Sequence, residues 1–373
     1  MKKLFTILAV AATLVSCAKE DVVREAAREA IGFDNAFVEN STRSVNDPSW
    51  SNAKLFSDFA VYGTVEGVEL FDKVEVSKNI VNAEQTKTSW DYAATQYWIA
   101  GAKYNFAAIA PYSNGVENVF TATKDTDDKY VGKTTFSFTN SGVNDLLYAQ
   151  TPEIEGKASG NTAIEFTFRH ILSKVKFSFE NGYNASTATI KVYDVKIENA
   201  YATATATLGK TSTAWANHAG TLVLDFGNAS DAEATTDVKE SAEKAYAYGA
   251  TYESLNERFL IPGIAPSVTY EVKDAEGNKS NVTANAYKVT FKVDLLVNNT
   301  RVKTYNHTAY AQFAPVAGNS YDIKTVINAN NIDPENKQEP IQFTVTSIDG
   351  WDNGNTHDSD DDDDNVKDHY PLN

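Results

Sequence analysis

The length of 373 residues exceeds the roughly 100 to 200 residues of a single domain, so the chain should hold two domains and accessory segments. Fifty acidic residues against 33 basic ones give a net charge of −17, which has the wrong sign for a nucleic-acid partner. Hydrophobic residues make up 42% of the chain, enough for packed cores, and the single cysteine rules out disulfides within the chain and thiolate metal clusters.

The first seventeen residues indicate export. Two lysines near the start precede an apolar run over 4–15 that is too short to span a bilayer, as in a signal peptide. The run ends in Leu-Val-Ser-Cys at Cys17, which resembles the lipobox of bacterial lipoproteins. We therefore predict a signal peptide over residues 1–16 and lipidation of the Cys17 thiol, whose acyl chains would anchor the protein to a membrane. An ordinary secretory signal with a chance cysteine is the alternative.

The residues after Cys17 predict a segment ahead of the folded body. Residues 18–21, Ala-Lys-Glu-Asp, resemble the signal that sends lipoproteins of some Gram-negative anaerobes to the outer face of the outer membrane. The stretch 21–30 predicts a short charged helix or a tether, and 31–38 a brief β-like patch. The polar stretch 40–44 predicts an exposed loop, in which Arg43 would be open to proteases.

From Phe56 onward, apolar residues alternate with polar ones in short runs bounded by Gly, Asn, Asp and Pro, while helical periodicity is nearly absent. The clearest run is Tyr287 to Val297, where one parity is apolar and the other mostly polar. Such a strand has one buried and one solvated face. The spacing of these runs predicts an all-β chain of sandwich type.

A change of parity divides the chain. The apolar residues are even-numbered up to Phe168 and odd-numbered from Ile171, so a strand should end or change sheet between them. The polar, Gly-rich stretch 155–161 just upstream predicts a linker. We therefore predict an N-terminal domain over 44–160 and a C-terminal domain over 161–351. The polar stretch 231–253 predicts an inserted loop or short helix.

The last segment, 352–373, carries eight acids and one lysine. Like charges at this density repel one another, which predicts a solvated, disordered tail. Calcium is the alternative ligand, because residues 358–365 offer many hard oxygens. That run lacks the glycine and the distal glutamate of an EF-hand loop, so no metal site is predicted.

No motif of an enzyme is present, since the chain has no HExxH, GxSxG, GxxxxGK[ST] or strand-associated GxGxxG sequence. We predict no catalytic residue, no cofactor and no enzymatic activity. A pair of carboxylates for glycoside hydrolysis would meet only in space, so that alternative has no support in the sequence. His170 lies at the parity break, where a structural role is expected.

Aromatic residues could form a surface that stacks on sugar rings. In a sandwich such residues more often pack in the core or on a sheet face. The candidates are Trp50, Trp90, Tyr92, Tyr97, Trp98 and Trp215.

Several segments together resemble the fimbrillin family, the Mfa-like and FimA-like pilins and pilus lipoproteins. Besides the lipobox they are Ile31-Gly-Phe33 followed by Thr42-Arg43, the strand 104–112, residues 145–149, the run 166–177 and the closing 345–351. Each is a weak strand pattern alone, and their order and spacing carry the likeness over residues 1 to about 351.

The resemblance implies two transthyretin-like Greek-key β-sandwich domains in tandem and assembly of subunits by strand exchange. An arginine-specific protease would cut between Arg43 and Ser44, so that 17–43 is a propeptide with 31–38 as its placeholder strand. The freed groove would accept the C-terminal strand of a neighbouring subunit, here 341–348. Its inserted row would be Ile341, Phe343 and Val345. Arg24 and Arg28 offer other cleavage points.

The implied function is that of a structural or accessory subunit of cell-surface pili, exported as an outer-membrane lipoprotein and supporting adhesion. Its partners would be other pilin subunits, in a homo- or heteropolymer, and the outer membrane through the lipid until processing. The alternative is a surface lipoprotein that does not polymerise and binds a host glycan or protein.

Overall fold

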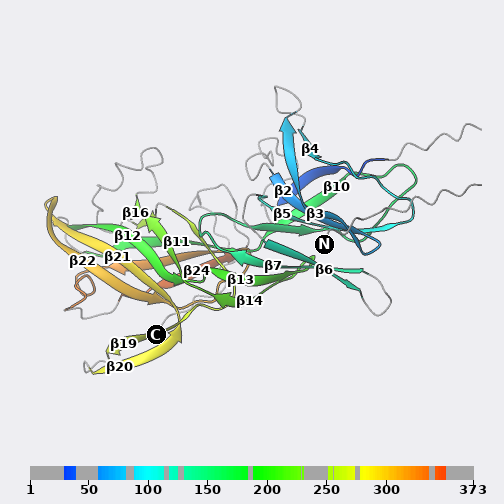
Figure 1. The fold of residues 1–373 in the computed structure, drawn as a ribbon. Coiled ribbons are helices and arrows are strands. Elements are labelled where there is room, and N and C mark those ends of the chain that lie inside the picture. Colours follow the sequence, from blue (N-terminus) through cyan, green and yellow to red (C-terminus); the bar gives the residue numbers. More distant parts are fainter. Residues whose placement is uncertain are drawn as a thin grey trace, which may run out of the picture.

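The computed structural model describes the parts of the chain that carry its strands. The described residues are 29–38, 58–80, 88–112, 117–124, 130–183, 188–227, 229–230, 251–254, 256–273, 278–335 and 341–349. Every regular element within these ranges is a β-strand, so the predicted all-β fold class is confirmed. No helix in the described ranges is long and apolar enough to cross a membrane. The molecule is elongated, with one group of strands at each end and a smaller sheet between them (Figure 1).

Eight strands form the sheet at one end, and their hydrogen-bonding path closes on itself. In sheet order they are β2 (Asp58–Val65), β3 (Val68–Ile80), β4 (Thr88–Tyr92), β1 (Phe33–Val38), β10 (Ile164–His170), β8 (Leu147–Gln150), β5 (Lys103–Ala110) and β9 (Ile154–Glu155). Because β2 also pairs with β5, the first seven strands make a closed ring. We call the aromatic cluster inside it the ring core.

A four-stranded sheet lies in the middle of the molecule. Its order is β14 (Thr213–Ala219), β13 (Thr203–Leu208), β7 (Tyr130–Thr139) and β6 (Glu117–Lys124). Its inner face shares a core with the outer face of β2 and β5. β2 and β5 are therefore buried on both sides, which explains why they are nearly continuous apolar runs without alternation.

Two further sheets face each other at the other end and form a sandwich. One contains β16 (Ala229–Ser230), β17 (Thr251–Ser254), β11 (Ser173–Asn181), β23 (Asn319–Ile327) and β24 (Thr344–Asp349), with β18 (Arg258–Leu260) also on β11. The other is β15 (Leu222–Gly227), β12 (Ala188–Ala200), β21 (Tyr287–Val297) and β22 (Thr300–Ala311). We call the cluster between them the sandwich core.

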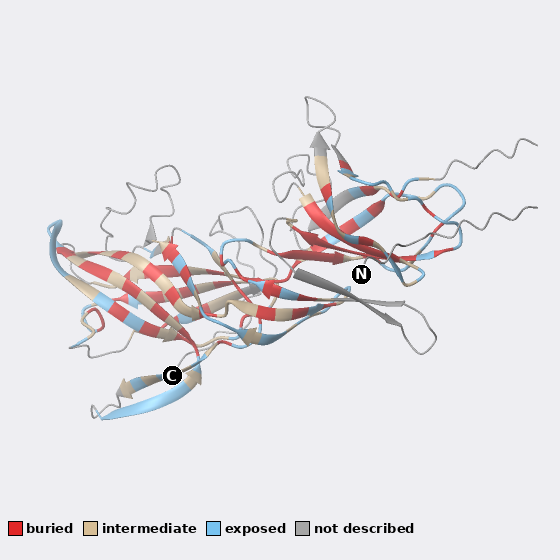
Figure 2. Ribbon diagram, viewed as in Figure 1, coloured by how far each residue is buried: buried red, intermediate tan, exposed pale blue. Residues whose placement is uncertain are grey.

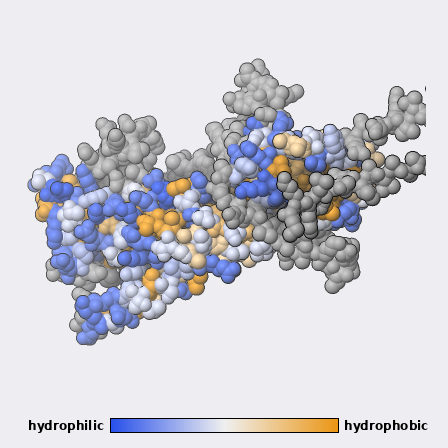
Figure 3. All heavy atoms as spheres, viewed as in Figure 1, coloured by the Kyte–Doolittle hydropathy of each residue, from blue (hydrophilic) through white to orange (hydrophobic). Residues whose placement is uncertain are grey.

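Burial follows the strands, with buried residues along the inner rows of both ends (Figure 2). A hairpin of β19 (Ser267–Lys273) and β20 (Lys279–Asn285) projects from the sandwich end. It is mainly hydrophilic in the view of Figure 3. β20 is almost wholly exposed, so this hairpin adds little to either core.

The clearest strand of the sequence, Tyr287–Val297, is confirmed as β21, and its apolar parity faces the sandwich core. The predicted change of sheet is also confirmed, because β10 ends at His170 in the ring and β11 starts at Ser173 in the sandwich. The inserted stretch 231–253 was expected without strands. Its last residues instead belong to β17, which pairs with β11.

The boundary near residue 160 stays a prediction, and two features of the sheets bear on it. β10 follows residue 160 but belongs to the ring, where it pairs with β1 and β8. β7 precedes residue 160 and pairs with β13, which follows it. Strands from both sides of the predicted boundary therefore share sheets.

Candidate functional site

The segment that begins at Glu29 is built into the ring as its closing strand. β1 lies between β4 and β10, pairing in parallel with β10 through Phe33–Ile164 and in antiparallel fashion with β4 through Phe33–Trp90. Parallel pairing requires a crossover connection, and more than a hundred residues separate β1 from β10. Taking β1 away would open the ring between β4 and β10.

Two side chains of this segment belong to the ring core. Ile31 is 1% exposed and Phe33 is 5% exposed. Among the described residues, five aromatic rings have centroids within 6.4 Å of that of Phe33, and they are Phe59, Phe71, Tyr92, Phe106 and Phe166. Burial of each such side chain contributes about 1.5–3 kcal/mol. The segment is thus part of the core and not a strap over it.

Main-chain hydrogen bonds hold the same segment on both sides. Trp98 N–H donates to the Glu29 carbonyl at 2.9 Å, and Ile31 N–H donates to the Gln96 carbonyl at 2.8 Å. Ile164 N–H donates to the Gly32 carbonyl at 2.8 Å. Residue 30 forms an antiparallel bridge with residue 97, and the main-chain bonds of residues 29 and 31 hold it in place, so the helix or tether predicted for 21–30 is wrong at its last two residues.

The Glu29 carboxylate is bound by a loop that we call the carboxylate cradle, formed by Gly160 and Asn161. Gly160 N–H donates to Oε1, and both the backbone N–H and the side-chain amide of Asn161 donate to Oε2, each at 2.7 Å. The hydrogen bonds from the backbone of Asn161 and of Gly160 hold the pKa of the Glu29 carboxyl below its usual range. Gly160 has a φ of +73°, which a residue with a side chain rarely adopts.

A cavity of about 390 Å³ adjoins the carboxylate cradle. Its lining includes Trp98, Ile154, Asn161 and Glu165. It therefore lies along the edge where the segment enters the ring.

Replacing Glu29 with glutamine should lower the melting temperature of the protein at pH 7. Because the folded-state pKa is depressed, the ionised carboxylate stabilises the fold above the ordinary glutamate range, and this is lost as pH falls through the folded pKa. The difference from wild type should shrink as the pH falls below the ordinary glutamate range. Thermal melts at pH 7 and at a series of lower pH values, with the exposed Glu69→Gln as control, test this. Equal melting of Glu29→Gln and wild type at pH 7 would contradict it.

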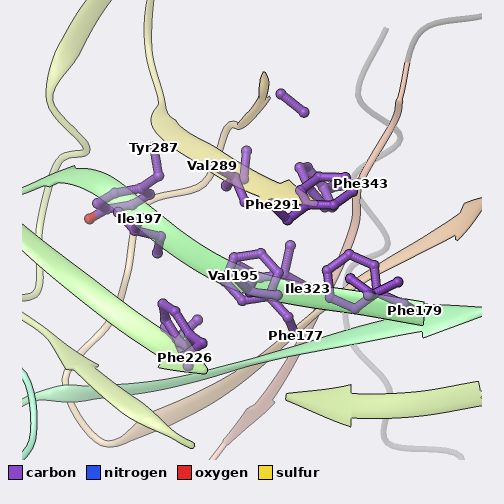
Figure 4. Close-up of a cluster of buried hydrophobic side chains, with 14 of the residues drawn as sticks. Phe177, Phe179, Val195, Ile197, Phe226, Tyr287, Val289, Phe291, Ile323 and Phe343 are labelled. Carbon is purple, nitrogen blue, oxygen red and sulfur yellow. The ribbon is translucent and has the colours of Figure 1, made fainter. Parts of the chain in front are cut away.

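The predicted donor row lies in the sandwich core of the same subunit. Phe343 is 2% and Val345 6% exposed, while Ile341 is partly buried against the same cluster. The Phe343 ring lies near Phe177 and Phe291, with centroid separations of 5.9 and 6.5 Å (Figure 4). β24 is the last strand of its sheet and pairs with β23. An edge strand can leave without breaking a sheet in two.

The other candidate residues differ in where they lie. Cys17, Arg43, Ser44, Trp50 and the tail 352–373 lie outside the described residues. Of the remaining aromatic candidates, Trp90 and Trp98 are core residues, and Tyr92 and Trp215 are partly buried. Tyr97 alone of those described is exposed. The described aromatic candidates therefore serve mainly in packing.

The Nδ1 atom of His170 lies 2.5 Å from the Oδ2 atom of Asp145.

The carboxylate cradle was not foreseen from the sequence. Its donors are largely backbone N–H groups of a Gly-rich loop, and the sequence of this loop predicts only a linker. Its ligand, Glu29, is one of several acids in a charged stretch.

The chain belongs to the fimbrillin-like family, whose family model matches residues 42–351. Membership supports a pilus-associated or adhesion-related role at the cell surface. None of the curated proteins matches the chain.

Solved structures that resemble the chain include the following three. A candidate cell adhesion protein from Bacteroides uniformis is 15% identical, with a TM-score of 0.43 over 87% of this chain and 99% of that one. A fimbrial assembly protein from Parabacteroides distasonis is 11% identical, with a TM-score of 0.35 over 78% and 87%. The fimbrial anchor protein Mfa2 from Porphyromonas gingivalis is 12% identical, with a TM-score of 0.31 over 86% and 98%.

Proposed function

We propose that the protein is a non-catalytic subunit of cell-surface pili that assembles by strand exchange. It is exported as an outer-membrane lipoprotein anchored at Cys17, and a protease cuts after Arg43. The segment before the cut then leaves the ring, and the C-terminal strand of another subunit enters. The observation that carries this proposal is that β1, upstream of Arg43, closes the ring between β4 and β10.

The energetics favour this use of β1. Once β1 leaves, the edges of β4 and β10 lose their partner and the aromatic rings around Phe33 meet water. An incoming strand restores both main-chain hydrogen bonds and apolar contacts, which is β-augmentation. A subunit with its segment still covalently attached cannot polymerise, because the intramolecular strand is always present at high effective concentration.

Replacing Arg43 with alanine should block polymer formation. Wild-type protein treated with an arginine-specific protease should give a ladder of multimers on gels run without boiling, while Arg43→Ala stays monomeric. Arg28→Ala is the matched control, because a cut after residue 28 leaves β1 in place. It should polymerise like wild type.

Equal ladders from Arg43→Ala and wild type would refute the assigned cleavage site. If no variant forms a ladder, including wild type, the polymerising function is wrong. Saturable binding of the monomer to a glycan array would then favour the surface adhesin.

A further inference from the structure

The pattern Glu-x-Ile-x-Phe occurs twice in the 373 residues, once at each end of the folded chain. It is Glu29-Ala-Ile-Gly-Phe33 in the segment that closes the ring and Glu339-Pro-Ile-Gln-Phe343 in the predicted donor segment. We propose that residues 339–344 of a second copy occupy the places of residues 29–34 one for one, with the Glu339 carboxylate in the carboxylate cradle. This register rests on the strand exchange proposed above.

The apolar positions of the two segments coincide. Ile341 takes the place of Ile31, and Phe343 the place of Phe33 among the five aromatic rings. The next position is exposed in both segments, with Asp34 in one and Thr344 in the other. Phe343 would thus leave aromatic neighbours in the sandwich core for aromatic neighbours in the ring core.

The proline of the donor segment falls at a position that needs no N–H group. The main-chain bonds around residue 30 run from Trp98 N–H to the carbonyl of residue 29 and from residue 31 N–H to the Gln96 carbonyl. Both bonds are made by residues 29 and 31, and residue 30 takes part in neither. Pro340 can therefore replace Ala30 without losing either bond, although proline is excluded where a strand must donate.

The glutamine of the donor segment also fits its place. A Cβ atom built on Gly32 meets only the Ala163 Cβ, at 3.8 Å, which is an ordinary van der Waals contact. Gly32 has no left-handed φ that a larger residue would resist. The carbonyl of residue 32, which accepts from Ile164 N–H, is present in any residue. Gln342 can therefore replace Gly32.

The carboxylate cradle selects this register over its neighbours. When Glu29 leaves, three N–H donors lose an ionic acceptor, and hydrogen bonds to charged groups are the stronger ones. A shift of the donor by two residues in one direction brings Lys337 to the cradle and Glu339 to the buried place of Ile31, and a shift in the other direction brings Ile341 to the cradle. A lysine there places further donors against the three N–H groups, and an isoleucine leaves these solvent-accessible groups to water. Only Glu339 restores the acceptor.

The correspondence is confined to these six positions. The ladder between β1 and β10 has a bulge between Asp34 and Ala36, whereas β24 pairs with β23 without one. Because the bulge adds one residue to β1, positions beyond residue 34 no longer correspond one for one to positions of the donor segment. The register is therefore set at the start of the segment, at the cradle and at Phe33.

The test uses synthetic fluorescent peptides covering residues 335–349 and full-length protein cleaved after Arg43. Peptide retained on the protein is measured by size-exclusion chromatography across a concentration series. The Glu339→Gln peptide should bind several-fold more weakly than wild type. A Lys337→Glu/Glu339→Lys peptide of unchanged composition should lose at least as much. Glu335→Gln, in the same peptide, should bind like wild type.

Equal binding of the Glu339→Gln and wild-type peptides would overturn the register and leave strand exchange standing. Failure of the wild-type peptide to bind a protein that still polymerises would overturn the assignment of this segment as the occupant. If the protein neither binds the peptide nor polymerises, the proposed function itself is wrong.

Discussion

Replacing Phe33 with alanine should destabilise the ring end of the molecule by about 3–5 kcal/mol. The substitution leaves a cavity among five aromatic rings that cannot collapse together, because they come from different strands of a closed ring. Urea unfolding followed by tryptophan fluorescence measures this directly, since Trp90 and Trp98 belong to the same core. The transition assigned to the ring should move to lower urea concentration.

The matched control is Glu69→Ala, an exposed residue of strand β3 in the same ring. It should change stability by no more than about 0.5 kcal/mol. A loss below about 1 kcal/mol for Phe33→Ala would mean that the segment lies on the ring without contributing to its core. The proposed role of β1 as a placeholder would then lose its energetic basis.

Strands with one solvated face could be predicted from their alternation, which β2 and β5 lack because both of their faces are buried. Tyr287–Val297 alternates since its two faces meet the sandwich core and water, and the bounds of β21 match that run. The parity break between Phe168 and Ile171 located the passage from one sheet to another for the same reason. Alternation indicates whether each residue faces the core or water, and it does not indicate which strands pair.

Pairing between distant strands has no comparable pattern in the sequence. β1 lies beside β10 and β11 beside β23, both in parallel, and no feature of these four segments predicts which strand pairs with which. Closure of the ring through β2 and β5 depends on these pairings, so it could not be foreseen. The same holds for the carboxylate cradle, where Glu29 meets a loop 131 residues away in sequence.

Family resemblance, and not periodicity, led to the prediction of a placeholder and a donor strand. The proposed exchange is consistent with the packing, since each segment places an isoleucine and a phenylalanine against a core that contains aromatic residues. In one subunit these cores are separate, the ring core for residues 31 and 33 and the sandwich core for 341 and 343. A sequence that satisfies both cores is restricted to the few residue types that both accept.

Locking β24 to its own sheet with a disulfide should abolish polymer formation. Lys324 and Thr344 are paired residues of β23 and β24, and their neighbours Ile323 and Val345 face the core, so both point outward. Paired Cα atoms in antiparallel strands are roughly 4.5–5.5 Å apart, within the range that a disulfide spans. After cleavage at Arg43 the oxidised Lys324→Cys/Thr344→Cys protein should stay monomeric, and reduction should restore the ladder.

A control disulfide in a hairpin that takes no part in the proposed exchange shows whether holding β24 in place, and not cross-linking as such, prevents polymer formation. Thr269 and Thr283 face each other in the β19–β20 hairpin, with their hydroxyl oxygens 2.8 Å apart. The Thr269→Cys/Thr283→Cys protein should polymerise equally well oxidised and reduced, because this hairpin belongs to neither core. Since cleavage removes Cys17, the introduced thiols are the only ones present in either protein. A ladder from the oxidised β23–β24 lock would mean that β24 stays in place, and a strand from elsewhere would have to fill the ring.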